Sequence, residues 1–135
     1  MIPLMRLEYL EDLEAQSSPR VLLAYGTDPR GAAVLRDTVE QLAASSEAHG
    51  VRIDKLPGFQ PVEGCSLTAS VGSVDSGVEK LEGSERAFRC VLRPATWRRV
   101  WGLLEPFEIE MGPNGFQWLS EEGPIEWIIS GDRGW

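Results

Sequence analysis

Residues 93–107, RPATWRRVWGLLEPF, carry the clearest secondary-structure signal in the chain. Apolar side chains recur there at positions i, i+3, i+4 and i+7, as on one face of an α-helix: Trp97, Val100, Trp101 and Leu104. Pro94 suits the first turn of this helix, and Pro106 is expected to end it. The stretch therefore predicts an amphipathic helix that packs its tryptophans against the rest of the domain.

The residues after this helix alternate between apolar and polar side chains, which is the pattern of half-buried β-strands. The alternating segments are FEIEM (107–111), FQWLS (116–120) and IEWIIS (125–130). Asn114-Gly115 favours a hairpin turn between the first two. We therefore expect a C-terminal three-stranded antiparallel meander.

In the first half of the chain, residues 20–56 are predicted to form a strand, a helix and a second strand. RVLLAY (20–25) and VRIDKL (51–56) read as strands, and the first is expected to be buried on both faces. Asp28 and Pro29 suit the start of the intervening helix, and Gly50 suits its end. The apolar face of this helix is marked by Ala32, Leu35, Val39 and Leu42.

Two further strands and an N-terminal helix complete the predicted secondary structure. Residues 65–71 and 87–92 alternate as strands do, and the Gly- and Ser-rich residues 72–86 are expected to connect them. Leucines at every third position, between charged residues, indicate an amphipathic helix in residues 1–16 and not a signal peptide. We therefore predict one α+β domain, residues 1–135, with a mixed or antiparallel sheet and helices packed on one face.

Composition and charge exclude several classes of function. The net charge of −8 argues against binding to nucleic acid or to an anionic membrane surface. Residues 105–135 contain seven acidic residues and a single base, Arg133, so most of the negative charge lies near the C-terminus. Arginine outnumbers lysine eleven to two, and glycine and alanine are abundant, which indicates a GC-rich bacterial source. We expect a cytoplasmic bacterial protein with no membrane span.

Tryptophans and cysteines are mainly expected in the core. Trp97, Trp101 and Trp127 are predicted to form an aromatic cluster, whereas the side on which Trp118 lies depends on the hairpin register. Cys65 and Cys90 are separated by 25 residues, which fits neither a CxxC motif nor a zinc knuckle. They are predicted to be buried free thiols, with a disulfide as the alternative.

No catalytic or metal-binding motif is found. The single histidine, His49, is expected at the C-terminal end of a helix, where the helix dipole favours its charged form. A G-x-S-x-G motif is absent, and too few ligands are available for zinc. We expect no cofactor and no metal, and the sequence does not favour an enzyme.

The main candidate site is an acidic surface near the C-terminus. Alternation places acidic side chains on the outer face of the predicted meander and in its turns, and Trp135 is expected to be exposed beside them. The candidate partner-binding residues are Glu108, Glu110, Glu121, Glu122, Glu126 and Trp135. Such a surface would bind a basic protein, with an immunity protein or an antitoxin-like inhibitor as the concrete form. A face that is merely solvated would show the same pattern.

Two alternatives remain open. The turn GTDPRG (26–31) lies between a strand and a helix, and it could bind an anion or small ligand at the helix N-terminus through Gly26, Thr27, Arg30 and Gly31. It has neither the G-x-x-x-x-G-K-[ST] nor the G-x-G-x-x-G spacing. The chain could also be a non-catalytic subunit of a larger assembly. The sequence specifies neither the partner nor the oligomeric state.

Overall fold

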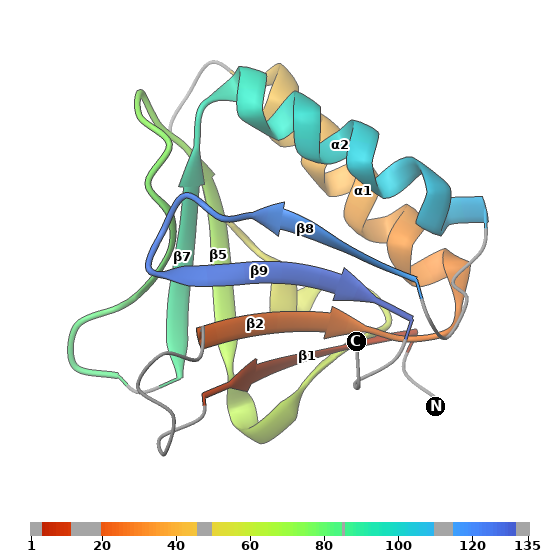
Figure 1. The fold of residues 1–135 in the computed structure, drawn as a ribbon, viewed down its shortest axis with the longest axis horizontal. Coiled ribbons are helices and arrows are strands. Elements are labelled where there is room, and N and C mark those ends of the chain that lie inside the picture. Colours follow the sequence, from red (N-terminus) through yellow and green to blue (C-terminus); the bar gives the residue numbers. More distant parts are fainter. Residues whose placement is uncertain (1–3, 12–19, 46–49, 85, 110–114, 132–135) are drawn as a thin grey trace.

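The computed structural model describes residues 4–11, 20–45, 50–84, 86–109 and 115–131, and it has the predicted α+β fold in one body (Figure 1). The strands are β1 (Met5–Leu10), β2 (Arg20–Tyr25), β3 (Gly50–Arg52), β4 (Phe59–Pro61), β5 (Ser66–Val71), β6 (Gly77–Lys80), β7 (Ala87–Leu92), β8 (Phe116–Ser120) and β9 (Ile125–Ser130). The helices are α1 (Pro29–Ala44) and α2 (Pro94–Ile109). Of these, β2, α1, β5, β7, α2, β8 and β9 correspond closely to predicted elements.

All the described strands belong to one mixed sheet, in the order β3-β5-β7-β6-β9-β2-β1-β4, and β8 pairs with β9. β9 runs parallel to β2 along its full length and antiparallel to β8. It meets β6 at a single residue pair, Val78 and Ile125. In Figure 1, β5 and β7 cross the direction of β1, β2 and β9 at a steep angle, and α1 and α2 lie together on one side. The sheet is therefore bent into two halves that join at β6 and β9.

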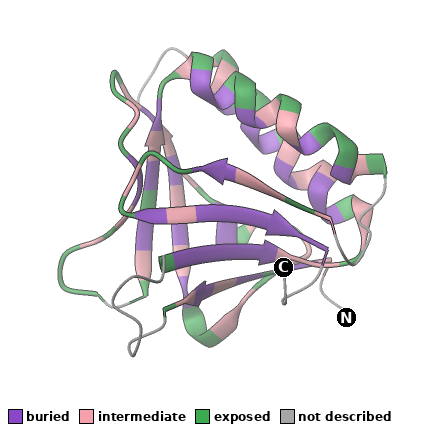
Figure 2. Cartoon of the chain, in the orientation of Figure 1, coloured by how far each residue is buried: buried purple, intermediate pink, exposed green. Residues whose placement is uncertain are grey.

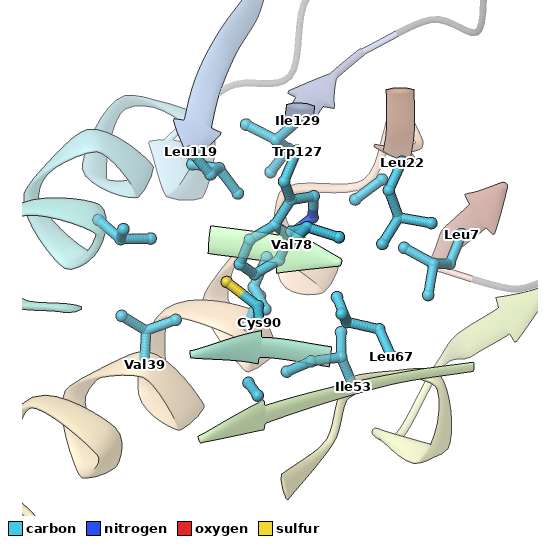
Figure 3. Close-up of a cluster of buried hydrophobic side chains, with 14 of the residues drawn as sticks. Leu7, Leu22, Val39, Ile53, Leu67, Val78, Cys90, Leu119, Trp127 and Ile129 are labelled. Carbon is cyan, nitrogen blue, oxygen red and sulfur yellow. The ribbon is translucent and has the colours of Figure 1, made fainter. Parts of the chain in front are cut away.

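The main core fills the space between the two helices and the inner face of the bent sheet. Trp97 of α2 and Trp127 of β9 are fully buried and meet edge to face, with their ring centroids 6.2 Å apart. Trp127 lies at the centre of the cluster, close to Cys90 and Val78 (Figure 3). Trp97 Nε1 donates to the C=O of Ser70 at 3.0 Å. The predicted core positions of Trp97 and Trp127 are confirmed, whereas Trp101 is half-buried.

The N-terminal helix was predicted wrongly, because Met5–Leu10 form strand β1. The leucine spacing of three residues fits a helix, but Met5, Leu7 and Tyr9 also alternate with more exposed residues, as a strand requires. β1 pairs antiparallel with β2 and parallel with β4, so both of its edges are hydrogen-bonded. This long-range pairing, which no local pattern reveals, decides the conformation. Residues 1–3 and 12–16 lie outside the described residues.

The predicted three-stranded meander is also wrong, because Phe107–Ile109 continue α2 past Pro106. A proline near the end of a helix removes one intrahelical hydrogen bond, and tertiary contacts can compensate for it. Here Phe107 is buried in the core and Glu108 forms an ion pair with Arg36 of α1. The C-terminal strands are therefore β8 and β9, joined by residues 121–124. Glu110, Met111 and Asn114 lie outside the described residues.

Smaller differences concern the connections. The predicted loop 72–86 contains β6, which pairs with β7 and reaches β9. Helix α1 ends at Ala44 with Ser45 as its C-cap, and Gly50 begins β3 and does not end the helix. Of the predicted strand 51–56, the part after Arg52 forms a 3-10 turn, Ile53–Lys55. His49 lies outside the described residues.

Candidate functional site

The face of the sheet that points away from the helices differs between its two halves. Strand alternation fixes which side chains lie there, because residues i and i+2 share a face. On β3, β5 and β7 most of these side chains are polar: Arg52, Ser66, Thr68, Ser70 and Arg89. On β1, β2, β8 and β9 most are apolar or aromatic.

A small apolar cluster lies at the centre of this second half, and no residue of α1 or α2 belongs to it. Val21, Leu23 and Ile128 are buried there. The partly buried Leu10, Tyr25 and Trp118 pack against them. Because the main core lies on the opposite side, β2 and β9 are buried on both faces along most of their length (Figure 2). This confirms the predicted burial of β2.

Aromatic residues around this cluster hold carboxylates of neighbouring strands. Tyr25 Oη donates to Glu8 Oε1 at 3.0 Å, and Trp118 Nε1 donates to Glu126 Oε2 at 3.2 Å. Phe116 stands edge-on to Trp118, with ring centroids 5.1 Å apart, and is 41% exposed. Hydrogen bonds to a charged acceptor are stronger than neutral ones, so each ring and its carboxylate are held in a fixed relation. We call this surface the outer aromatic face: Glu8, Leu10, Val21, Leu23, Tyr25, Phe116, Trp118, Glu126 and Ile128.

Sequence reasoning identified Glu126 on this face and missed Glu8, Tyr25 and Phe116. Glu8 was missed because its strand was interpreted as a helix. Alternation along residues 116–120 places Phe116 on the same face of the strand as Trp118. It does not say which face of the sheet this is, because the pairing of β8 with β9 shifts register between Trp118 and Ser120. The pairing of Trp118 with Ile128 places both of them on the outer face.

The structure does not bring the described members of the predicted acidic set together on one face. Glu108 lies in α2, where its Oε2 accepts from Arg36 Nη1 of α1 at 2.9 Å. Glu122 lies in the β8–β9 turn and accepts from Arg99 Nη2 of α2 at 2.8 Å. Glu121 is exposed in the same turn, and Glu126 lies on the outer face of β9. Glu110 and Trp135 lie outside the described residues.

The environment of Glu122 shows that this carboxylate helps to hold the β8–β9 turn. Partial burial raises its pKa, but hydrogen bonds from Ser120 Oγ and backbone N–H groups, together with Arg99, outweigh burial and lower the pKa below its ordinary value. The acid is therefore stabilised in its charged form by the chain itself. The ion pair between Glu122 and Arg99 links the β8–β9 turn to α2, on the helix side of the sheet.

The turn at residues 26–31 uses its polar groups internally. The Asp28 carboxylate caps α1 by accepting from the N–H of Arg30, and it also accepts from Arg30 Nη2 at 2.7 Å. Hydrogen bonding to Arg30 lowers the pKa of Asp28. The N–H of Gly31 donates to the C=O of Asp28, and the N–H of Gly26 to that of Ser130. An external anion would have to displace the Asp28 carboxylate, and exposed Thr27 provides the remaining side chain of the predicted set.

The two cysteines are buried and free, as predicted. Burial raises the pKa of Cys65 to about 11, and its Sγ donates to the C=O of Leu7 at 3.0 Å. Burial also raises the pKa of Cys90. Within the described residues, no group of three or more metal-ligating side chains is present, and no helix is long and apolar enough to span a membrane.

Comparison of the chain with models of protein families, with curated proteins and with solved structures gave no match. A functional hypothesis therefore depends on the chemistry of the surface itself. The outer aromatic face combines exposed Phe116 and half-buried Trp118 with a buried apolar base and oriented carboxylates on the helix-free side of the sheet.

Proposed function

We propose that this protein is a small acidic protein-binding module that binds a basic partner protein through the outer aromatic face. One observation carries the proposal: exposed Phe116 and half-buried Trp118 lie beside Glu126 above a buried apolar cluster. Aromatic residues at the centre of a patch, with charged groups around them, are the usual composition of protein–protein hot spots.

The charge of the whole chain supports a basic partner. The net charge is −8, and a field of one sign increases the association rate of an oppositely charged protein. Most arginines of the described chain are already paired with its own carboxylates, including Arg36, Arg52, Arg86, Arg89, Arg93 and Arg99. The excess of acids is therefore the charge that a partner encounters.

An immunity protein or an antitoxin-like inhibitor of a basic protein, in the bacterial cytoplasm, is the concrete form of this proposal. Inhibitors of this kind need fast association and slow dissociation. The net charge would provide the first property, and desolvated aromatic anchors would provide the second. The anion-binding alternative receives less support, because Asp28 already occupies the N-terminus of α1.

Capture of the partner by immobilised variants tests the proposal. We expect the Phe116→Ser/Trp118→Ser double variant to lose the protein that the wild-type chain retains, with affinity reduced at least about a hundredfold. Val74→Ser is the matched control, since Val74 is 65% exposed in the loop between β5 and β6. Equal retention by the double variant and the control would contradict the proposal.

The charge component is tested separately. Glu126→Gln should weaken partner binding roughly tenfold and reduce its dependence on salt concentration. Glu82→Gln, at an exposed position in the β6–β7 connection, removes one charge elsewhere and should leave affinity nearly unchanged. Circular dichroism and thermal melting of every variant show whether the fold is retained. Equal effects of the two substitutions would exclude a specific role for Glu126.

A further inference from the structure

The carboxylate of Glu126 has one oxygen available for a further hydrogen bond. Its Oε2 accepts from Trp118 Nε1 at 3.2 Å, whereas within the described residues no donor reaches Oε1 and no cation pairs with the group. Glu108 and Glu122, by contrast, each form an ion pair with an arginine of the chain. Glu126 is half-buried, and a charge that is partly removed from water is stabilised when a cation joins it. The described chain therefore presents a charged acceptor without supplying its cation.

The indole of Trp118 lies between Phe116 and Glu126 on the outer aromatic face. Trp118 pairs with Ile128 and Phe116 with Ser130, so Phe116 and Glu126 lie on opposite sides of Trp118 along the strand direction. The indole N–H lies in the plane of the ring, so the carboxylate that accepts from it lies at the edge of the ring and not over a face. Phe116 and Glu126 therefore hold the partly exposed indole in place from two sides.

Between its helices, the chain contains an arginine that contacts a tryptophan and a carboxylate together. The guanidinium of Arg36 lies 3.9 Å from the ring centroid of Trp101, and its Nη1 donates to Glu108 at 2.9 Å. Trp118 and Glu126 provide the same two groups, and no cation of the described chain lies over the Trp118 ring. A guanidinium from outside would complete the same trio, with a cation–π contact and an ion pair.

The β8 side of the outer aromatic face also differs in charge from the β1 side. Arg6 shares a face of β1 with Glu8 and lies opposite Tyr25, so the β1 side already carries a cation of the chain itself. Neither β8 nor β9 contains a basic residue. A cation that approaches Trp118 therefore meets no like charge from the two strands that carry the site.

We propose that the basic partner places one arginine side chain on the outer aromatic face, with its guanidinium stacked on Trp118 and donating to Glu126. The inference rests on the proposed function and names the group that the same face recognises. A guanidinium is planar, stacks on aromatic rings and donates in its own plane, whereas the lysine ammonium is a compact, strongly hydrated charge. The aliphatic stem of an arginine can also lie along the apolar side chains around the site.

A short peptide tests the inference without knowledge of the natural partner. The probe is acetyl-Gly-Arg-Gly-amide, and two matched probes carry either citrulline, which removes the charge and keeps the shape, or lysine. The readout is the indole N–H resonance of Trp118, because this proton is donated to Glu126. We expect the arginine probe to shift this resonance with a Kd at least about fivefold lower than that of the citrulline probe and about threefold lower than that of the lysine probe. A citrulline or lysine probe that binds as tightly as the arginine probe would overturn the inference.

A substitution of the carboxylate shows whether the arginine binds at this position. Glu126→Gln keeps an oxygen that can accept from Trp118 Nε1 and removes the charge, so the preference for arginine over citrulline should disappear. Glu82→Gln is the matched control, since it removes an exposed charge in the β6–β7 connection and should leave the preference unchanged. An arginine preference that survives in Glu126→Gln would contradict the proposed contact.

The captured partner distinguishes this inference from the proposed function. If an arginine of the partner contacts Glu126, replacing that arginine should make the further substitution Glu126→Gln nearly without effect on affinity, as a double-mutant cycle measures. If Phe116→Ser/Trp118→Ser loses the partner but no partner arginine is coupled to Glu126, the face is the docking surface and the arginine contact is wrong. If the double variant retains the partner, the proposed function itself fails.

Discussion

Gly77 and Gly123 lie in contact where the two halves of the sheet meet. Gly77 has a φ of +70°, a conformation that L side chains rarely adopt, and a Cβ on it would overlap the backbone of Gly123. A Cβ on Gly123 would lie 2.5 Å from the C=O and 2.7 Å from the N–H nitrogen of Val78. Both neighbours are backbone atoms, so a rotamer change cannot relieve the overlap. The bend of the sheet therefore depends on these two glycines.

We expect Gly123→Ala to lower the free energy of unfolding by roughly 2 kcal/mol, because the two backbone segments must separate. Gly102→Ala is the control, since a Cβ there meets no atom within 4 Å in the middle of α2. It should raise the free energy of unfolding by about 0.5–1 kcal/mol, through helix propensity. Urea titrations measure both values. A Gly123→Ala chain as stable as the wild type would contradict the close crossing of β6 and β9.

At the same scale, the tryptophans show what sequence periodicity can and cannot predict. Trp97 follows from the helical stripe and Trp127 from strand alternation, and both are buried as expected. Trp118 could not be assigned from alternation, because the register shift in β8 changes which residue faces outward. The outward position of Trp118 therefore required the tertiary structure.

At the scale of elements, the ion pair of Arg36 joins α1 to α2. The Arg36 side chain is 14% exposed, and its Nε donates to the C=O of Trp101 at 3.0 Å. We expect Arg36→Ala to reduce the free energy of unfolding by roughly 2 kcal/mol, because a largely buried hydrogen-bonded charge is removed and Glu108 loses its partner. Arg98→Ala removes an exposed arginine beside the same ring and should have an effect within about 0.5 kcal/mol. Similar losses for both variants would contradict this role.

The start of α2 depends on a carboxylate from a distant segment. Asp75 accepts from the backbone N–H of Arg93 at 2.8 Å and from Thr96 Oγ1 at 2.7 Å. Partial burial raises the pKa of Asp75, but these hydrogen bonds and the Arg93 guanidinium outweigh burial and hold the pKa below its ordinary value of 3.8. The loop between β5 and β6 is therefore linked to the N-terminus of α2.

A carboxyl with a lowered folded-state pKa stabilises the fold above its unfolded pKa, and this stability is lost as the pH falls through the folded pKa. We therefore expect the contribution of Asp75 to the free energy of unfolding to be lost as the pH falls below about 4. Asp75→Asn should reduce stability by about 1 kcal/mol near neutral pH and make the acid limb of the pH–stability curve less steep. Denaturant titrations at a series of pH values measure this. An unchanged acid limb would exclude Asp75 as a contributor.

The wrongly predicted elements have one physical cause. Residues 5–10 and 107–109 carry patterns compatible with both a helix and a strand, and non-local contacts decide between the two. Pairing with β2 and β4 selects the strand at β1, and packing against α1 selects the helix at the end of α2. Elements with one dominant period, such as α1 and β5, were predicted correctly.

At the scale of the whole molecule, the sequence predicted the fold class but neither the strand order nor the bend. Strand order depends on long-range pairings such as β2 with β9, which are about a hundred residues apart in sequence and leave no local signal. The predicted acidic residues do not share one face, because their positions also depend on long-range contacts. Glu108 and Glu122 pair with arginines of α1 and α2, and of the predicted acids that the structure describes, only Glu126 lies on the outer aromatic face.

Hydroxyl-radical footprinting of the chain, free and bound to its captured partner, tests the docking face most directly. Val74 and Ile109 are 65% and 78% exposed and lie outside the outer aromatic face, so they serve as internal references. We expect oxidation of Phe116 and Trp118 to fall at least about fivefold on binding, while that of both references is unchanged. Protection of the references, with Phe116 and Trp118 still oxidised at the rate of the free chain, would contradict docking through this face.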